Sequence, residues 1–340
     1  MHSFRNDYSE GAHPRILQAL IDTNLEQDNG YGEDRYTNEA IELIKMTMKN
    51  NTVDIHLLSG GTQTNLIAIS AFLRPHEAVI AASTSHILTH EAGAIEATGH
   101  KILSIFTDNG KISAKSIIEM VNAHTDEHMV KPALVYLSQS TEVGSIYSKA
   151  ELIAIRKVCD SHQLLLYIDG ARLGSALCAF ENDVNLTDLS ELTDAFYIGG
   201  TKNGALLGEA LIIVNTGLKK DFRFHLKQKG ALLAKGRLLG IQFRELFKDH
   251  LFFELAKHAN LMAQRLQDGL VKEGFRFMTH SPTNQLFPVL PNELIHILQK
   301  NFSFYIWTQL DEKHSIIRLV TSWATTDQHI TDFLDAIKKR

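Results

Sequence analysis

The sequence predicts an α/β fold, in which a mostly parallel sheet lies between helices and a small α+β domain follows at the C-terminal end. The 340 residues suffice for about two domains, and 44% apolar with 21% charged residues is a globular composition. Short continuous apolar runs alternate with helix-like segments over the first two thirds, which is typical of strands buried on both faces. The last hundred residues group strands and helices differently.

The N-terminal two thirds contain the elements of the larger predicted domain. Pro14 begins a helix whose apolar residues recur at helical spacing through Ile21. Residues 66–73 form an apolar helix, and Ser148 with Glu151 forms a capping box that begins another helix. The predicted strands are residues 54–59, 79–82, 133–138, 164–169, 195–198 and 210–214.

The C-terminal part has the pattern of a separate small domain. A long helix is expected over residues 250–272, and Gly274 ends it. Strand-like runs follow around 284–290, 302–307 and 315–322, and the final segment has the apolar spacing of an amphipathic helix. We therefore expect a large domain over residues 1–245, including the N-terminal segment, and a small domain over residues 246–340.

Composition narrows the range of partners and locations. The net charge is −5, from 34 basic and 39 acidic residues, and such a surface argues against a nucleic-acid partner. No apolar run approaches the roughly 18 residues of a membrane span, and the first residues lack the apolar core of a signal peptide. The two cysteines, Cys159 and Cys178, form no CxxC pair, which favours a reducing, cytoplasmic location.

Two charged residues lie at or shortly after the ends of predicted strands, where open α/β sheets bind their ligands. Asp169 either holds a protonated ring nitrogen of a cofactor or caps the next helix. Lys202 lies among glycines that leave room for a bulky group beside its amine. A desolvated lysine is a nucleophile toward a carbonyl, although most loop lysines are simply solvated.

A glycine-rich turn joins the first strand of the predicted sheet to a helix. The free N–H groups of Gly60 and Gly61, with the Thr62 hydroxyl, form an anion cradle suited to a small phosphate. The nucleotide motifs GxGxxG and GxxxxGK[ST] are absent. A tight turn that merely requires glycine is the alternative interpretation.

Other polar residues allow different chemistries. His86 and His90 have helical i, i+4 spacing that suits a metal, but the HExxH motif is absent, and a ring packed on a flat cofactor is the better use of one histidine. Arg318 interrupts an apolar strand, so its guanidinium either binds a substrate carboxylate or points to solvent. Together, a phosphate turn, a histidine, an acidic residue, a lysine and a late arginine are the set that a pyridoxal-phosphate enzyme needs.

On these residues the chain resembles the low-specificity L-threonine aldolases of the β-eliminating lyase group, which have the fold type I architecture of pyridoxal-phosphate enzymes. The resemblance covers nearly the whole chain. Its motifs are residues 4–8, 31–34, 59–65, His86 with 91–93, 169–172 and 317–321.

The resemblance implies a role for each of these positions. Lys202 attaches the cofactor, Asp169 pairs with its pyridine nitrogen, and His86 stacks on its ring. Gly60, Gly61 and Thr62 hold the phosphate, with Arg172 and Lys227 also near the cofactor. The residues implied for the substrate are Arg172 and Arg318, which receive its carboxylate, with Asn6 and Tyr31.

The chain departs from the family pattern at three places. Ser140-Thr141-Glu142 stands where the family often has Asn-Thr-His, so Glu142 must substitute for that histidine or the role moves elsewhere. Thr201 precedes the lysine in place of the usual serine. Either Lys235 or Arg237 replaces the arginine that reaches a neighbouring subunit's phosphate.

The implied activity is cleavage of L-threonine or L-allo-threonine to glycine and an aldehyde, by a homo-oligomer whose sites are shared between subunits. His86, Glu91, Glu142 or a water molecule could be the base for the hydroxyl group, and the preferred isomer stays open. The alternatives are β-elimination or transamination on the same fold, a metal-dependent hydrolase built on His86 and His90, and a binding protein without catalysis.

Overall fold

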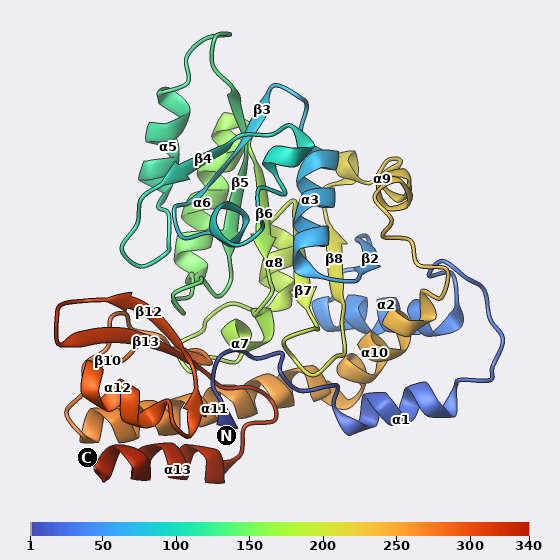
Figure 1. Ribbon diagram of the computed structural model, residues 1–340. Helices are drawn as coiled ribbons and strands as arrows, with labels where there is room; N and C mark the ends of the chain where they lie inside the picture. Colours follow the sequence, from blue (N-terminus) through green and yellow to red (C-terminus); the bar gives the residue numbers. More distant parts are fainter. Residues whose placement is uncertain (1, 340) are drawn as a thin grey trace.

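A seven-stranded sheet forms the centre of the larger part of the computed structural model, which describes residues 2–339 (Figure 1). In spatial order its strands are β2 (Asp54–Leu58), β8 (Glu209–Ile213), β7 (Ala195–Gly199), β6 (Leu165–Asp169), β5 (Lys131–Ser138), β3 (Glu77–Ala82) and β4 (Ile102–Ile105). β8 runs antiparallel to both neighbours, and the other adjacent pairs are parallel. The predicted mostly parallel sheet is confirmed.

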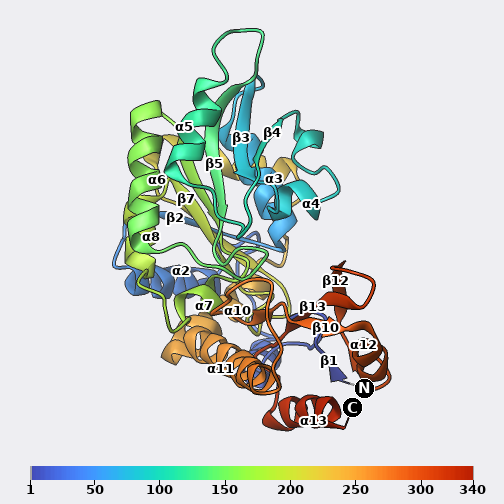
Figure 2. The ribbon, with the colours of Figure 1, turned by 90° about the vertical axis from the view of Figure 1, so that its left-hand side faces the viewer.

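Helices cover both faces of this sheet. Figure 2 shows α5, α6 and α8 on one face and α3 on the other. The helices of this part are α1 (Pro14–Asp22), α2 (Arg35–Met48), α3 (Gly61–Phe72), α4 (His86–Thr89), α5 (Ala114–Asn122), α6 (Lys149–His162), α7 (Leu173–Leu177), α8 (Leu186–Leu192), α9 (Phe222–Gln228) and α10 (Arg237–Phe247).

Alternate residues of each strand enter two separate cores. In β5, Val135 and Leu137 belong to the core beneath α5 and α6, whereas Leu134 and Tyr136 belong to the core beneath α3. Because side chains alternate across a strand, a strand covered on both faces needs apolar residues at every position. This explains the continuous apolar runs in the sequence.

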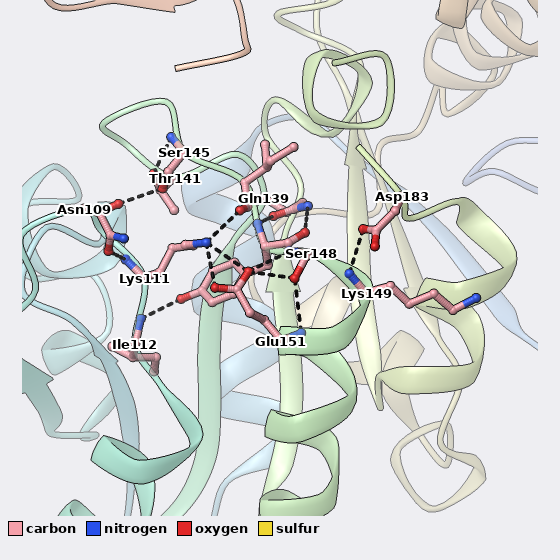
Figure 3. A network of polar contacts seen from close by, with 12 residues as sticks. Asn109, Lys111, Ile112, Gln139, Thr141, Ser145, Ser148, Lys149, Glu151 and Asp183 are labelled. Carbon is pink, nitrogen blue, oxygen red and sulfur yellow. Dashed lines mark hydrogen bonds and ion pairs between the residues drawn. The ribbon is translucent and has the colours of Figure 1, made fainter. Parts of the chain in front are cut away.

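The connection between β5 and α6 is held by a polar network that includes the predicted capping box (Figure 3). The Ser148 N–H donates to Glu151 Oε2 at 2.8 Å, and the Glu151 N–H donates to Ser148 Oγ at 3.3 Å. Lys111 Nζ lies 2.7 Å from Glu151 Oε1. The start of α6 is therefore tied to the loop that follows β4.

The C-terminal elements form a smaller antiparallel sheet with helices on one side (Figure 1). β13 (His314–Val320) pairs with β12 (Tyr305–Gln309), with β10 (Val289–Pro291) and with β9 (Gln285–Leu286). The predicted run 284–290 is thus divided, since Pro288 has no N–H to donate to a ladder. The helices here are α11 (Leu251–Lys272), α12 (Asn292–Leu298) and α13 (Asp327–Lys338).

The start of the chain packs with these C-terminal elements. β1 (His2–Ser3) pairs in parallel with β11 (Phe302–Ser303), and the Phe4 ring lies 5.3 Å from that of Phe333. The domain boundary near residue 245 falls within α10 and stays a prediction. Over residues 2–339 no helix combines the length and the apolar character needed to cross a membrane.

Candidate active site

A cavity of about 710 Å³ lies beyond the carboxyl ends of the parallel strands, against the smaller sheet. Lys202 follows β7, Arg172 follows β6 and His86 follows β3, and all three line the cavity. Arg318, on β13, lines it from the smaller sheet together with the aromatic side chain of Trp307 on β12. Four of the residues singled out in the sequence therefore meet in one space, at the position expected for a ligand in this class of fold.

Asp169 is buried and accepts hydrogen bonds on both carboxylate oxygens. Tyr136 Oη donates to Oδ2 at 2.5 Å, and Tyr197 Oη donates to Oδ1 at 2.5 Å. Asn65 Nδ2 donates to Oδ2 at 2.9 Å, and the Ala171 N–H donates to Oδ1 at 2.9 Å. Burial acts to raise the pKa of Asp169, but the nearby His86 and the side-chain hydrogen bonds outweigh it, so the pKa is lowered.

Asp169 is therefore a fixed anion, and the His86 side chain that lines the cavity is close enough to lower its pKa. The two phenols keep their protons, because burial and the Asp169 charge raise the pKa values of Tyr136 and Tyr197. They consequently act as donors to the carboxylate. Asp169 is not the N-cap of α7, a position that Arg172 occupies, so the alternative of simple helix capping does not describe it.

Lys202 presents an amine without a hydrogen-bond or ion-pair partner among residues 2–339. Its Nζ lies 6.0 Å from the centroid of the Tyr8 ring. Burial and the charge of Arg172 lower the pKa of Lys202, against the opposing effect of Asp7 and other acids. A lowered pKa increases the neutral, nucleophilic fraction of the amine.

Glu209 anchors the turn that carries this lysine. Its Oε1 accepts from Thr201 Oγ at 2.8 Å, and its Oε2 accepts from the Gly200 N–H at 3.2 Å. The Thr201 hydroxyl oxygen in turn accepts from the Gly208 N–H at 3.0 Å. Thr201, the residue that differs from the family's serine, thus supports the turn through its hydroxyl group.

A chain of hydrogen bonds connects His86 with Asp169. His86 Nδ1 lies 2.8 Å from Glu91 Oε1, and Asn65 Nδ2 donates to that same oxygen at 2.8 Å. Asn65 also reaches Asp169, so its amide group joins two buried carboxylates. The orientation of the His86 ring is therefore fixed from the side of Glu91.

The glycine-rich turn forms the N-terminal end of α3. Gly60 is the N-cap, no side chain caps the helix, and the N–H groups of its first turn have no partner within the helix. A Cβ atom at Gly61 would lie 3.0 Å from Tyr197 Oη, so a side chain there would press on the phenol that binds Asp169. Thr62 follows Gly61 in the first turn, where an anion is favourable.

The two arginines expected to bind a carboxylate differ in what they contact. Arg172 forms a two-pronged ion pair with Asp7, with Nε–Oδ2 at 2.7 Å and Nη2–Oδ1 at 3.0 Å. The Arg318 guanidinium has no hydrogen bond or ion pair among the described residues, and its buried Nε is unpaired; its Cζ lies 5.8 Å from the centroid of the Trp307 ring. Burial has the larger effect and the positive charge of Arg172 the smaller one, and together they lower the pKa of Arg318 to about 10.

Asn6, another residue expected to bind the substrate, has its side chain engaged within the N-terminal segment. Its Oδ1 accepts a hydrogen bond from the Tyr8 N–H at 3.0 Å.

Other predicted site residues lie apart from the Lys202 cavity within one chain. Tyr31 lines a second cavity of about 430 Å³, and Lys227 Nζ lies 4.5 Å from the centroid of its ring. Lys235 is exposed, and Arg237 donates to backbone carbonyl oxygens, including that of Thr23 at 2.5 Å.

Several residues of the site were not singled out by sequence reasoning. Tyr136 and Tyr197 lie inside apolar strands. Their hydroxyl groups, which need a hydrogen-bond partner when buried, were the feature of the sequence that could have indicated them. Asp7 stands in the 4–8 motif but was given no role, and Glu209 begins a strand whose other residues are apolar. His86 and His90 have ring centroids 5.5 Å apart, and within residues 2–339 no group of three or more potential metal ligands occurs.

Comparisons with known proteins show which family the chain resembles over its whole length. The chain is 32% identical over 345 residues to a low specificity L-threonine aldolase of Pseudomonas sp., covering 98% of this chain and 96% of that relative. The solved structure of Leishmania major threonine aldolase is 49% identical, with a TM-score of 0.99, and the match covers 100% of this chain and 99% of that one.

A more distant likeness concerns the fold alone. The histidinol-phosphate aminotransferase of Clostridium acetobutylicum is 16% identical, with a TM-score of 0.75 and coverage of 100% of this chain and 98% of that one. The predicted fold type I architecture is confirmed. Residues 4–292 match the family described as Beta-eliminating lyase, and the chain belongs to this family.

Proposed function

We propose that this protein is a pyridoxal-phosphate-dependent carbon–carbon lyase that cleaves L-threonine and L-allo-threonine to glycine and an aldehyde. The observation that carries the proposal is the meeting of the unpaired Lys202 amine and the unpaired Arg318 guanidinium in one cavity. An amine nucleophile and a carboxylate-binding group are what an amino-acid substrate requires. The threonine aldolases among the similar proteins suggest the substrate.

The residues present fit pyridoxal phosphate. Asp169 is a buried anion suited to a protonated pyridine nitrogen, and the uncapped end of α3 at Gly61 and Thr62 suits a phosphate. Lys202 supplies the amine for covalent attachment, and the His86 ring lines the same cavity. When bound, this cofactor supplies a sink for the electron pair of the breaking Cα–Cβ bond.

The chain's own residues bind and orient the substrate. Arg318 holds the substrate carboxylate, and this fixes which bond at Cα is aligned for cleavage. Arg172 borders the same space, but its guanidinium is already paired with Asp7, so Arg318 carries the larger part of carboxylate binding. The proton of the substrate hydroxyl group must leave as the aldehyde forms, and one proton must reach Cα to give glycine.

We also propose a homo-oligomer in which a second copy completes each site. Tyr31 and Lys227 lie together and are exposed, away from the Lys202 cavity of their own chain. Mixing Lys202→Ala and Lys227→Ala subunits tests this, because shared sites give part of the activity back and separate sites give none. A cytoplasmic location fits the two unpaired cysteines.

The first experiment reduces the holoenzyme with borohydride and maps the modified peptide. A pyridoxyl group on Lys202, with glycine and aldehyde as products from threonine, supports the proposal. Lys202→Ala should lose both covalent attachment and turnover, and aldolase activity retained by this variant contradicts the assignment. Ammonia with a keto acid, or a new amino acid, would instead indicate β-elimination or transamination.

A further inference from the structure

Glu142 is a carboxylate in the cavity and one of the candidate bases that the sequence leaves open. It lies in the loop after β5 and lines the space shared by Lys202 and Arg318. None of the ion pairs among residues 2–339 includes it. A carboxylate removed from water without a cationic partner is costly, so its presence beside the substrate space calls for a reason.

The two carboxylate oxygens of Glu142 have different surroundings. Oε1 accepts from the His86 N–H at 2.9 Å and from Ser138 Oγ at 2.6 Å. No hydrogen bond from another residue in the described part of the chain reaches Oε2. One oxygen therefore fixes the orientation of the carboxylate, and the other is free to accept a proton from a bound molecule.

The loop that carries Glu142 is held on both sides. The Gln139 side chain forms two hydrogen bonds with the Tyr147 backbone: its Nε2 donates to the carbonyl oxygen at 3.1 Å, and its Oε1 accepts from the N–H at 2.9 Å. Thr141 Oγ lies 2.8 Å from Ser145 Oγ, which donates to the Asn109 carbonyl oxygen at 2.7 Å. Figure 3 shows these contacts continuing to the start of α6. The carboxylate is thus preorganised, as a proton acceptor needs to be.

We propose that Glu142 accepts the proton of the substrate's β-hydroxyl group as the Cα–Cβ bond breaks. This inference rests on the proposed aldolase function. The hydroxyl O–H bond breaks and its proton passes to Oε2, the oxygen forms the carbonyl of the leaving aldehyde, and the electron pair of the broken bond passes to the cofactor.

The electrostatic surroundings support this role. Burial raises the pKa of Glu142, and the charge of Asp169 adds to this effect, while hydrogen bonds from Ser138 and from backbone N–H groups oppose it. A carboxylate with a raised pKa is a stronger base near neutral pH. The titratable groups around it are Asp169, Tyr136, Tyr147, His86 and Arg172, and the cavity adds Tyr8, His90, Lys202, Tyr305 and Arg318.

A purely positioning role is the main competitor, because Glu142 also holds the His86 backbone. Glu142→Gln separates the two roles, since the amide oxygen still accepts from the His86 N–H but cannot take a proton. Ser138→Ala is the second variant. It removes a hydrogen bond that lowers the Glu142 pKa and leaves the carboxylate in place. His90→Asn removes the imidazole of the cavity that has no side-chain hydrogen bond among the described residues.

The test measures kcat and kcat/KM of the holoenzymes for threonine against pH. The ionised carboxylate is the active form, so wild-type kcat/KM should fall as pH drops through a pKa above the usual 4.5. Glu142→Gln should lose about 10²–10⁴-fold in kcat with little change in KM, and it should lose this acid limb. Ser138→Ala should move the limb to higher pH, and His90→Asn should leave it in place.

Two further readouts do not depend on threonine cleavage. Exchange of the α-hydrogen of glycine with solvent involves no β-hydroxyl group, so Glu142→Gln should retain it. Burial also raises the pKa of Glu209 to about 8, so the infrared titration compares two cofactor-free proteins: the wild-type-minus-Glu142→Gln difference spectrum, in which Glu209 cancels, should show a carboxyl band above pH 4.5. Cleavage by Glu142→Gln within about 3-fold of wild type, equal loss of glycine exchange, or loss of the acid limb in His90→Asn would overturn the inference. A wild-type protein that does not cleave threonine would instead refute the proposed function.

Discussion

The ion pair between Asp7 and Arg172 offers a quantitative test of how the site is assembled. Asp7 is 1% exposed, and its carboxylate accepts two hydrogen bonds from Arg172 and one from Asn284 Nδ2 at 2.9 Å. Asp7→Asn keeps the size of the side chain but removes its charge. The Arg172 guanidinium is then left without a counter-ion in a region that excludes most water.

The expected loss follows from the burial of the pair. Removing one partner of a buried ion pair costs about 3–5 kcal/mol. An unfolding entropy of about 2.1 cal/mol/K per residue gives roughly 0.7 kcal/mol/K for a chain of this length, so Tm should fall by about 4–7 °C. Asp335→Asn is the control, because its pair with Lys338 at 3.2 Å is about half exposed on both sides and contributes at most about 1 kcal/mol.

Scanning calorimetry of the cofactor-free protein measures both variants. The reasoning is wrong if Asp7→Asn lowers Tm no more than Asp335→Asn does. The pH dependence gives a second check. Burial acts to raise the pKa of Asp7, but Arg172 and Lys202 outweigh it, so the pKa lies below the usual 3.8. The pair therefore stabilises the fold above about pH 3.8 and is lost as pH falls through the lower folded-state pKa, a loss that Asp7→Asn should lack.

Two further substitutions test the binding roles. Arg318→Ala should raise KM for the amino acid roughly 10- to 150-fold, the loss of about 1.5–3 kcal/mol of charge-assisted hydrogen bonding, with little effect on the Kd of pyridoxal phosphate. The reverse pattern would remove Arg318 from the substrate site. Tyr197→Phe removes the 2.5 Å hydrogen bond to Asp169, so the pKa of Asp169 should rise and the acid limit of pyridoxal-phosphate binding should move up by about 1 pH unit. A fluorescence titration with an unshifted acid limit would contradict this.

The predicted strands of the large sheet all occur, but their directions were only partly predictable. Periodicity finds a strand at 210–214 without saying which way it runs. The structure pairs β8 antiparallel with β7, and only nine residues separate Gly199 from Glu209. A parallel return requires a crossover of a dozen or more residues, so this connection permits only the antiparallel arrangement. The length of the loop was the signal, and apolar patterning alone does not contain it.

The residues of the site likewise divide into those that sequence patterns predict and those that they do not. Asp169 and Lys202 were predictable because the first ends a strand and the second closely follows one, and the carboxyl ends of parallel strands meet at one edge. The pairing of Arg172 with Asp7 joins residues 165 positions apart, and no local pattern contains that contact. The family resemblance assigns the Arg172 guanidinium to the substrate, and this stays a prediction; the structure adds that the same guanidinium is paired with the N-terminal segment. The separation of Tyr31 from Lys202 is likewise a property of the folded chain.

The first residues of the chain connect the two halves of the proposed site. Phe4 packs in the C-terminal core, and Asp7, three residues later, binds Arg172 beside Lys202. Arg318 belongs to the C-terminal sheet, whereas Lys202 belongs to the large sheet, so this short segment helps to set the distance between the carboxylate-binding group and the amine. Asp7→Asn should for this reason raise KM for the amino acid more than it weakens pyridoxal-phosphate binding, because the proposed cofactor-binding groups, Asp169 at the end of β6 and the start of α3, both belong to the larger part of the fold.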